Sequence, residues 1–259
     1  MAFFKDVWKI VTEHGDLLLR GVGNTLLIAV IGTLAGLLIG LLIGILRTTP
    51  FSRKKALRVL HKIADAICSV YIEVFRGTPM MVQAMVIYWG YAFASGGQTL
   101  PLIPSGIFIV SINTGAYMAE IVRGGILSID KGQFEGAQAL GMNHFQIMCR
   151  IILPQVVRNI LPSVSNEFII NIKDTSVLNV IGVAELYFYA GKIKLFNLQI
   201  FQTYFVVCVL YFILTFSISR LLRLAERKLD GKENYTICGS QSDFKAEIHI
   251  KEEENRVGD

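Results

Sequence analysis

Charged residues are scarce in this chain of 259 residues. Asp, Glu, Lys and Arg together make up 17% of the sequence, whereas hydrophobic residues make up 53% and the mean hydropathy is +0.53. A soluble globular domain carries about 25% charged residues and about 45–50% apolar residues. The low counts of proline and cysteine, six and four, also exclude a disordered chain, a collagen and a disulfide-stapled scaffold. This balance indicates a chain that lies in a lipid bilayer.

Motifs for metal, thiol and nucleotide chemistry are missing as well. The sequence has no C-x-x-C pair, and its four histidines are scattered, so neither a metal site nor a nucleophilic triad can be proposed. No G-x-x-x-x-G-K-[ST] sequence is present, and Gly21-Val22-Gly23 lacks the third glycine of a dinucleotide fingerprint. We therefore expect no catalytic residue, no metal and no cofactor in this chain.

Long uncharged runs are the most prominent feature that is present. Residues 26–46 hold no charge over 21 positions and residues 200–219 hold none over 20, and a helix needs about 20 such residues to cross a bilayer. Three further apolar stretches are interrupted by Thr78-Pro79, by Asn113 to Arg123 and by Lys173-Asp174. We predict an all-α membrane protein with five transmembrane helices, at about residues 24–46, 67–94, 103–124, 160–190 and 199–222.

Lys and Arg gather in alternate loops. Fifteen of them follow the first span, lie between the third and fourth spans, or follow the fifth, whereas five lie in the other outer segments. Because cytoplasmic loops are enriched in Lys and Arg, we predict that the N-terminus is outside and the C-terminus is cytoplasmic. The same distribution explains the net charge of +5, so no nucleic-acid partner is expected.

The two ends differ from the predicted transmembrane domain of residues 21–230. Phe3, Phe4, Val7, Trp8 and Val11 recur at helical spacing among charged residues, so residues 1–20 are predicted to form an amphipathic helix on the outer face of the bilayer. Residues 231–259 form a polar tail with an acidic run, and we expect this tail to be largely disordered.

Four glycines recur every four residues in the first span. Such a stripe lies on one helical face and lets another helix approach closely; its members are Gly32, Gly36, Gly40 and Gly44. The pattern predicts a packing face, and leaves open whether the partner helix belongs to this chain or to another.

Polar residues interrupt two of the predicted spans. Asn113, Tyr117 and Glu120 are four and three residues apart, so they share one helical face. Lys173 and Asp174 fall near the middle of the fourth span, where an ionisable residue costs about 2.5–3.5 kcal/mol. Interrupted helices line cavities because their freed backbone groups need polar partners. The two charges therefore either line a transport path, or form an internal pair or a cytoplasmic bend.

The cytoplasmic stretch of residues 129–158 predicts two short helices that meet at a glycine. Asp130 is a suitable cap for a helix that carries Phe134, Ala137 and Leu140 and stops at Gly141. A second amphipathic helix, from residue 145 to residue 153, precedes Pro154. The pair is suited to docking a soluble partner, although an ordinary interfacial hairpin would show the same pattern.

This stretch resembles the EAA motif of ABC importer permeases, which runs E-A-A, three residues, G, nine residues, I, one residue, L-P. Every gap is matched, and the one departure is a glycine in place of the usual second alanine, which costs a helix about 1 kcal/mol. The matching residues are Glu135, Gly136, Ala137, Gly141, Ile151, Leu153 and Pro154.

Other segments are similar to the polar amino-acid branch of the same family, and the resemblance covers about residues 15–230. They are Gly23-Asn24-Thr25-Leu26, Phe75-Arg76-Gly77-Thr78-Pro79 with Val82-Gln83, Ala116-Tyr117-Met118-Ala119-Glu120 with Arg123-Gly124-Gly125, and Lys173-Asp174-Thr175-Ser176.

The resemblance implies a type I ABC importer permease subunit in the bacterial cytoplasmic (inner) membrane. Such a subunit pairs with a second permease subunit, identical or homologous, binds two cytoplasmic ATPase subunits and receives substrate from an extracytoplasmic binding protein. Glu135, Ala137 and Gly141 would contact the ATPase, which alone would bind ATP, and import would proceed by alternating access.

Alternatives from other classes remain. A self-contained channel or secondary transporter would also span the membrane, but it has no ATPase for the cytoplasmic loop to engage, and an integral membrane enzyme lacks a catalytic cluster. Glu120 and Asp174 are suited to an ammonium group, and Arg123 or Lys173 to a carboxylate, which fits a zwitterion. The alternative is that these charges pair with each other or fix loops at the membrane surface.

Overall fold

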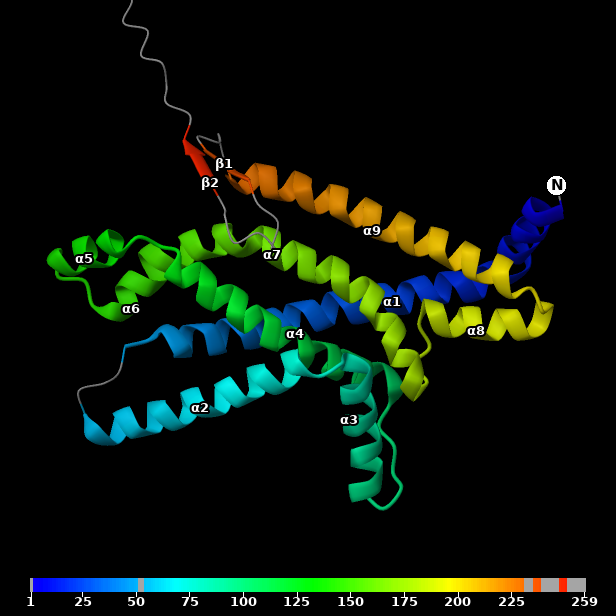
Figure 1. Ribbon diagram of the computed structural model, residues 1–259, viewed down its shortest axis with the longest axis horizontal. Helices are drawn as coiled ribbons and strands as arrows, with labels where there is room; N and C mark the ends of the chain where they lie inside the picture. The colour runs from blue at the N-terminus through cyan, green and yellow to red at the C-terminus, as the bar shows by residue number, and fades with distance from the viewer. Residues whose placement is uncertain (1, 51–53, 231–234, 239–246, 251–259) are drawn as a thin grey trace, which may run out of the picture.

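The computed structural model describes residues 2–50, 54–230, 235–238 and 247–250, and almost all of this part of the chain is helical (Figure 1). The segments in chain order are α1 (Ala2–Thr48), α2 (Lys55–Gly77), α3 (Met80–Ala94), α4 (Leu102–Leu127), α5 (Lys131–Ala139), α6 (His144–Ile147), the π-helical turn η1 (Met148–Ile152), α7 (Leu153–Asp174), the 3₁₀-helix η2 (Thr175–Ile181), α8 (Leu186–Asn197) and α9 (Ile200–Asp230).

Four helical stretches of the described chain are long and apolar enough to cross a membrane. They cover residues 3–48, 102–127, 144–181 and 200–228, and α3 is a shorter apolar helix. The predicted all-α membrane architecture is confirmed. The segment predicted as the second span supplies no single long helix, however, and the fourth is interrupted.

The second predicted span, residues 67–94, is divided into α2 and α3. Thr78 and Pro79 both have extended backbones between the two helices, because proline lacks an N–H and restricts the residue before it. α3 then turns sharply away from α2 and projects from the side of the molecule (Figure 1).

The fourth predicted span, residues 160–190, is likewise broken, at the charged pair that the sequence had placed near its middle. The α-helix ends at Asp174 and continues as the 3₁₀-helix η2, which ends at Gly182 with a positive φ of 89°. The chain then enters α8, which runs toward the same end of the molecule as the N-terminus (Figure 1).

The glycine stripe of the first span packs against α4 of the same chain. A Cβ on Gly32, Gly36 or Gly44 would lie 2.6 Å from Val110, 2.8 Å from Thr114 and 2.6 Å from Val122, and Gly40 abuts Met118 even more closely. Because both sets of numbers rise together, α1 and α4 run parallel. An even number of crossings between α1 and α4 would make them antiparallel, so the parallel register fits one crossing by the α2–α3 segment between them.

The basic loops gather at one end of the molecule. Figure 1 shows the end of α1, the start of α2, α5, α6 and the end of α9 toward the left, and the N-terminal end of α1 and the end of α8 at the right. Three buried clusters follow this axis: one joins α4, α5, η1 and α7, one joins α1, α3, α4 and η2, and one joins α1, α8 and α9.

The two ends of the chain are described in part. Non-helical φ and ψ at His14 mark a kink that divides α1 into two helices, and the first of them lies within the predicted N-terminal helix of residues 1–20. In the tail that was predicted to be largely disordered, the described segments β1 (Tyr235–Cys238) and β2 (Glu247–Ile250) pair in antiparallel register. The rest of the tail lies outside the described residues.

Candidate functional site

The EAA-like stretch forms two short helices joined by a tight turn. Asp130 caps α5, since its carboxylate accepts a hydrogen bond from the Gly132 N–H at 2.6 Å. Gly141 has a φ of +77°, a conformation that costs other residues about 1–2 kcal/mol. Asn143 and Gln146 then form a reciprocal capping box at the start of α6. The sequence thus encodes the turn locally, through a cap, a left-handed glycine and a second cap.

One face of α5 is buried and the other is open. Ala137 is only 4% exposed, and it belongs with Phe134 to the cluster that includes Val122 and Ile152. Glu135 and Gly136 are exposed. Two large apolar side chains beside them, Leu140 and Phe145, are 82% and 75% exposed. The loop is therefore seated firmly on α4 and α7 while it presents a mixed polar and apolar face outward.

The last three residues of the motif lie where the loop enters α7. Ile151 and Leu153 are partly buried against the same cluster, and Pro154 is exposed in the first turn of α7. The helix that was predicted to stop before Pro154 instead continues, because η1 is a π-helical turn. Such a turn accommodates a proline, which removes an α-helical hydrogen bond. A rigid helical connection therefore links the loop to α7.

Asn113 fastens the elbow between α2 and α3 to α4. Its side-chain amide donates to the Gln83 Oε1 at 2.8 Å and to the Phe75 carbonyl at 3.4 Å. Gln83 in turn donates to the carbonyls of Phe75 and Thr78, each at 2.9 Å. Asn113 is therefore engaged in holding the break in the second span.

Glu120 is paired with two arginines. It accepts from Arg47 of α1 at 2.9 Å and from Arg123 at 2.9 Å, and Arg47 also reaches Asp65 of α2 at 3.1 Å. The alternative reading, in which Glu120 and Arg123 pair with each other, describes this arrangement. Tyr117, one turn earlier, lies under the guanidinium of Arg76 at 5.6 Å.

Lys173, Asp174 and Ser176 lie at the break of the fourth crossing. Lys173 is exposed, whereas Asp174 and Ser176 are partly buried. No salt bridge joins Lys173 to Asp174, both of which the structure describes, so the internal pair, which was one of the alternatives to a transport path, is not formed. The charges lie where the backbone changes from an α-helix to a 3₁₀-helix.

Residues 36–231 match the family described as binding-protein-dependent transport system inner membrane component. This match covers most of the chain, including the loop, both broken crossings and three of the four glycines of the stripe. The chain belongs to this permease family.

Curated relatives carry transport names. The chain is 39% identical to the glutamine transport system permease protein GlnP of Escherichia coli K12, over 86% of this chain and 97% of that protein. It is 42% identical to the L-cystine transport system permease protein TcyB of Bacillus subtilis, over 63% of this chain and 70% of that protein.

Solved structures are similar in fold as well. A crystal structure of an amino acid ABC transporter with histidines has a TM-score of 0.72 and 36% identity, and the match covers 84% of this chain and 96% of that chain. Inward-facing MetNI methionine transporter structures share the fold, with a TM-score of 0.66 at 22% identity.

Two buried polar residues of this permease were missed by the sequence reasoning. Glu167 is 9% exposed, seven residues before Asp174 on α7, and Asp174 and Arg76 both lie close enough to act on it electrostatically. Asn171 is 3% exposed and joins three helices: it donates to Thr33 of α1 at 2.8 Å and accepts from Thr114 of α4 at 3.1 Å. The signal was available, since both are polar residues inside a predicted span.

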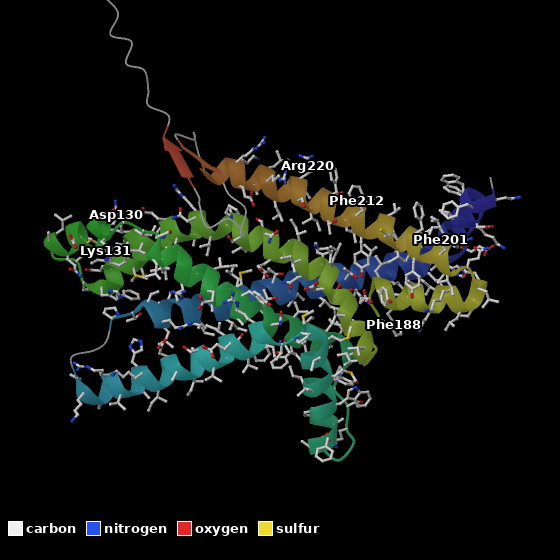
Figure 2. All side chains as sticks on the ribbon, viewed as in Figure 1. Asp130, Lys131, Phe188, Phe201, Phe212 and Arg220 are labelled. Atoms are coloured by element: carbon white, nitrogen blue, oxygen red, sulfur yellow. The ribbon has the colours of Figure 1, made fainter. Side chains whose placement is uncertain are left out.

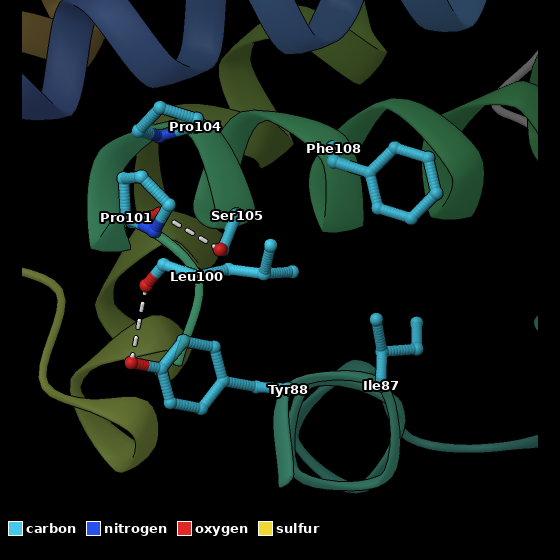
Figure 3. Close-up of a pocket in the computed structure, with 7 residues that line it drawn as sticks. All are labelled: Ile87, Tyr88, Leu100, Pro101, Pro104, Ser105 and Phe108. Carbon is cyan, nitrogen blue, oxygen red and sulfur yellow. Dashed lines mark hydrogen bonds between the residues drawn. The ribbon is translucent and has the colours of Figure 1, made fainter. Parts of the chain in front are cut away.

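An apolar cavity lies beside α3 and lacks the charged groups that a transport site for an amino acid needs. It measures about 140 Å³ and sits between α3 and α4, as Figure 3 shows. Its polar groups are satisfied internally, since Tyr88 donates to the Leu100 carbonyl and Ser105 to the Pro101 carbonyl. With no charged residue in its lining, this cavity offers nothing to an ammonium or carboxylate group.

Polar side chains of three helices therefore face a common region. Arg76 of α2 acts electrostatically on both Glu120 of α4 and Glu167 of α7, and Asp174 adjoins Glu167. Figure 2 shows side chains along the full length of the bundle, with the labelled loop residues Asp130 and Lys131 at one end and Phe201 toward the other.

Proposed function

We propose that this chain is the membrane subunit of an ATP-driven importer that moves a polar amino acid across the bacterial cytoplasmic membrane by alternating access. The observation that carries the proposal is the α5–Gly141–α6 unit, which is seated on α4 and α7 by its buried face and exposes Glu135, Leu140 and Phe145. A loop so placed transmits a push from a docked protein directly into two helices of the bundle.

Two cytoplasmic ATPase subunits dock on the permease dimer through this loop and its counterpart in the second subunit. They supply the ATP-binding site, so that ATP is used by the partner and no cofactor is bound by this chain. A second permease subunit, identical or homologous, completes the membrane domain within the lipid bilayer. An extracytoplasmic binding protein delivers the substrate, in keeping with the binding-protein-dependent family name.

The proposed substrate class rests on the names of the relatives and on the charged residues of the polar region formed by α2, α4 and α7. The relatives are named for glutamine and L-cystine, both zwitterions. Because Glu120 is neutralised by two arginines, the carboxylates that remain for an ammonium group are Glu167 and Asp174. We expect Asp174→Asn to raise the KM for uptake; an unchanged KM would remove Asp174 from the path.

Co-purification in detergent with a candidate ABC ATPase subunit tests the coupling. Glu135→Lys and Gly141→Asp alter the exposed docking face and the turn, respectively, without touching the buried cluster. Lys228→Glu reverses an exposed charge on α9, on the same predicted side, and serves as the matched control. We expect the ATPase to stay with the wild type and the control and to be lost from both loop variants.

Two results would contradict the proposal. Retention of the ATPase by both loop variants would move the docking site elsewhere. Failure of the wild-type chain to retain any ATPase, together with solute movement without ATP, would favour a self-contained channel or secondary transporter instead.

A further inference from the structure

Glu185 is a fully buried carboxylate that belongs neither to the α5–Gly141–α6 unit nor to the polar region around Arg76, Glu167 and Asp174. It is 0% exposed and lies in the short connection between η2 and α8. Its two oxygens accept hydrogen bonds from the backbone N–H groups of Tyr187 and Phe188, at 2.8 and 2.7 Å, and from the Tyr211 hydroxyl of α9 at 2.8 Å. One side chain thus begins α8 and ties it to α9.

The backbone around Glu185 is held from the other side by α1. The Asn24 amide donates to the Ala184 carbonyl at 2.6 Å, and the Leu186 N–H donates to the Thr25 hydroxyl at 3.2 Å. Gly21 adds a close approach, since a Cβ there would lie 2.7 Å from the Leu186 Cα. We call this set of residues the outer clasp: Gly21, Asn24, Thr25, Glu185 and Tyr211.

The chain just before the outer clasp is built differently. From Thr175 to Ile181 it has 3₁₀ geometry, and Gly182 has a left-handed backbone, so the hydrogen bonds of this stretch have poorer geometry than those of an α-helix. On the N-terminal side of this stretch, α7 follows directly on the η1 turn. That turn joins α7 to α5 and α6 in the loop of residues 129–158, which we call the coupling loop. The fourth crossing therefore has three parts: the α-helix α7, the 3₁₀-helix η2, and the segment around Glu185 that the outer clasp holds in place.

Capping alone does not explain a glutamate at this position. Ser, Thr, Asp and Asn are the preferred N-cap residues, and burial of a carboxylate is costly unless its oxygens are fully engaged. The longer side chain of Glu185 reaches both the α8 backbone and Tyr211, which a shorter cap would not do. The contact to α9 is thus the part of the arrangement that requires glutamate.

We infer that Glu185 is a positioning residue that fixes the outer end of the fourth crossing to α1 and α9 while α7 moves with the coupling loop about the η2 joint. This inference rests on the proposed importer function. With the clasp intact, a displacement of α7 opens or closes the path. When the clasp is broken, α8 follows α7, and ATP hydrolysis is no longer converted into import.

The test measures uptake of labelled L-glutamine and ATP hydrolysis side by side, in the assembled complex in proteoliposomes. Tyr211→Phe removes the α9 contact and leaves the α8 cap, and Glu185→Asp keeps a good cap on a shorter side chain. Tyr204→Phe is the control, because it removes another α8–α9 hydroxyl contact, to Lys194 at 3.2 Å. We expect about a tenfold loss of uptake per ATP hydrolysed in both clasp variants, and a wild-type ratio in the control.

The same preparations report the position of α8 directly. Spin labels at Asp16 of α1 and Lys192 of α8, both exposed, should keep one separation with and without ATP in the wild type, and two separations in Tyr211→Phe. A wild-type uptake-to-ATP ratio in both clasp variants would overturn the inference. So would a parallel fall of uptake and hydrolysis with the amount of folded protein, since this would mean a purely structural role. A wild-type complex with no ATP-dependent uptake would instead refute the proposed function.

Discussion

At the scale of single residues, the turn between α5 and α6 depends on glycine at position 141 and not at position 136. Gly141 has a left-handed backbone with open space around its Cα, whereas Gly136 is helical and exposed. The strain of a side chain at position 141 therefore comes from the backbone alone. At position 136 a side chain meets nothing, so alanine there only improves the helix.

Gly141→Ala should weaken binding of the ATPase by about 1–2 kcal/mol, which is about tenfold, because a left-handed alanine is strained by that amount. Gly136→Ala should leave binding unchanged or tighten it, because alanine favours the helix by about 1 kcal/mol. Titration of the ATPase onto permease in nanodiscs measures both. Equal losses in the two variants would show that side-chain bulk, and not backbone conformation, governs docking.

Sequence patterns predicted residues whose roles are local and missed residues whose roles depend on contacts. The Asp130 cap and the Gly141 turn follow from neighbouring residues, so spacing was sufficient. Glu120 has one partner nearby in the sequence, Arg123, but its second partner, Arg47, lies 73 positions away. Glu167, Asn171 and Glu185 act through distant helices in the same way, and only the fold brings their partners to them.

At the scale of helices, α1 and α4 are the most extensively packed pair in the described part of the chain. The glycine stripe places the two backbones close together over about three turns, with Gly40 against Met118. Periodicity predicted the stripe, but the identity of the partner helix needed the fold, because a small-residue face fits any close neighbour.

Gly40→Ala should therefore lower the free energy of unfolding by about 1–3 kcal/mol, since an added methyl group overpacks the contact. Gly23→Ala, on the same helix, is the matched control: a Cβ there meets no atom within 4 Å, so stability should be unchanged or raised. Thermal unfolding in detergent reports the difference. A Gly40 variant as stable as the control would mean that α1 and α4 are not packed through this face.

Hydrogen bonds of the Asn171 side chain join α7 to α1 and α4. Asn171→Ala should cost about 0.6–1.7 kcal/mol, the range measured for hydrogen bonds between membrane helices. Asn166→Ala removes an exposed amide from the same helix and should cost little. A double-mutant cycle with Thr33→Val isolates the bond. A coupling energy near zero would show that Asn171 and Thr33 contribute independently.

At the scale of the whole molecule, the loops sort into two ends, as the Lys and Arg distribution predicted. The breaks in the second and fourth predicted spans did not follow from that distribution. The number of Lys and Arg residues in a loop indicates on which side of the membrane the loop lies, but it says nothing about the course of the helix between two loops. The parallel register of α1 and α4 fits an odd number of crossings between them, and the prediction of an outer N-terminus rests on the Lys and Arg distribution.

Labelling with a membrane-impermeant maleimide tests this orientation. Cys149 is exposed in the coupling loop, so in a variant without the other cysteines it should react in inside-out vesicles and not in intact spheroplasts. Asp16→Cys, with Cys149 also replaced, should react in spheroplasts. Reaction of both sites from the same side would contradict the predicted topology.

The central claim is that this chain converts ATP hydrolysis in a docked partner into solute import. Uptake of labelled L-glutamine and L-cystine by proteoliposomes that contain the permease, its ATPase and the binding protein tests it most directly. We predict uptake of at least one of them that requires ATP and all three components and that is abolished by Glu135→Lys. ATP-independent uptake of either solute by the permease alone, unaffected by Glu135→Lys, would contradict the account.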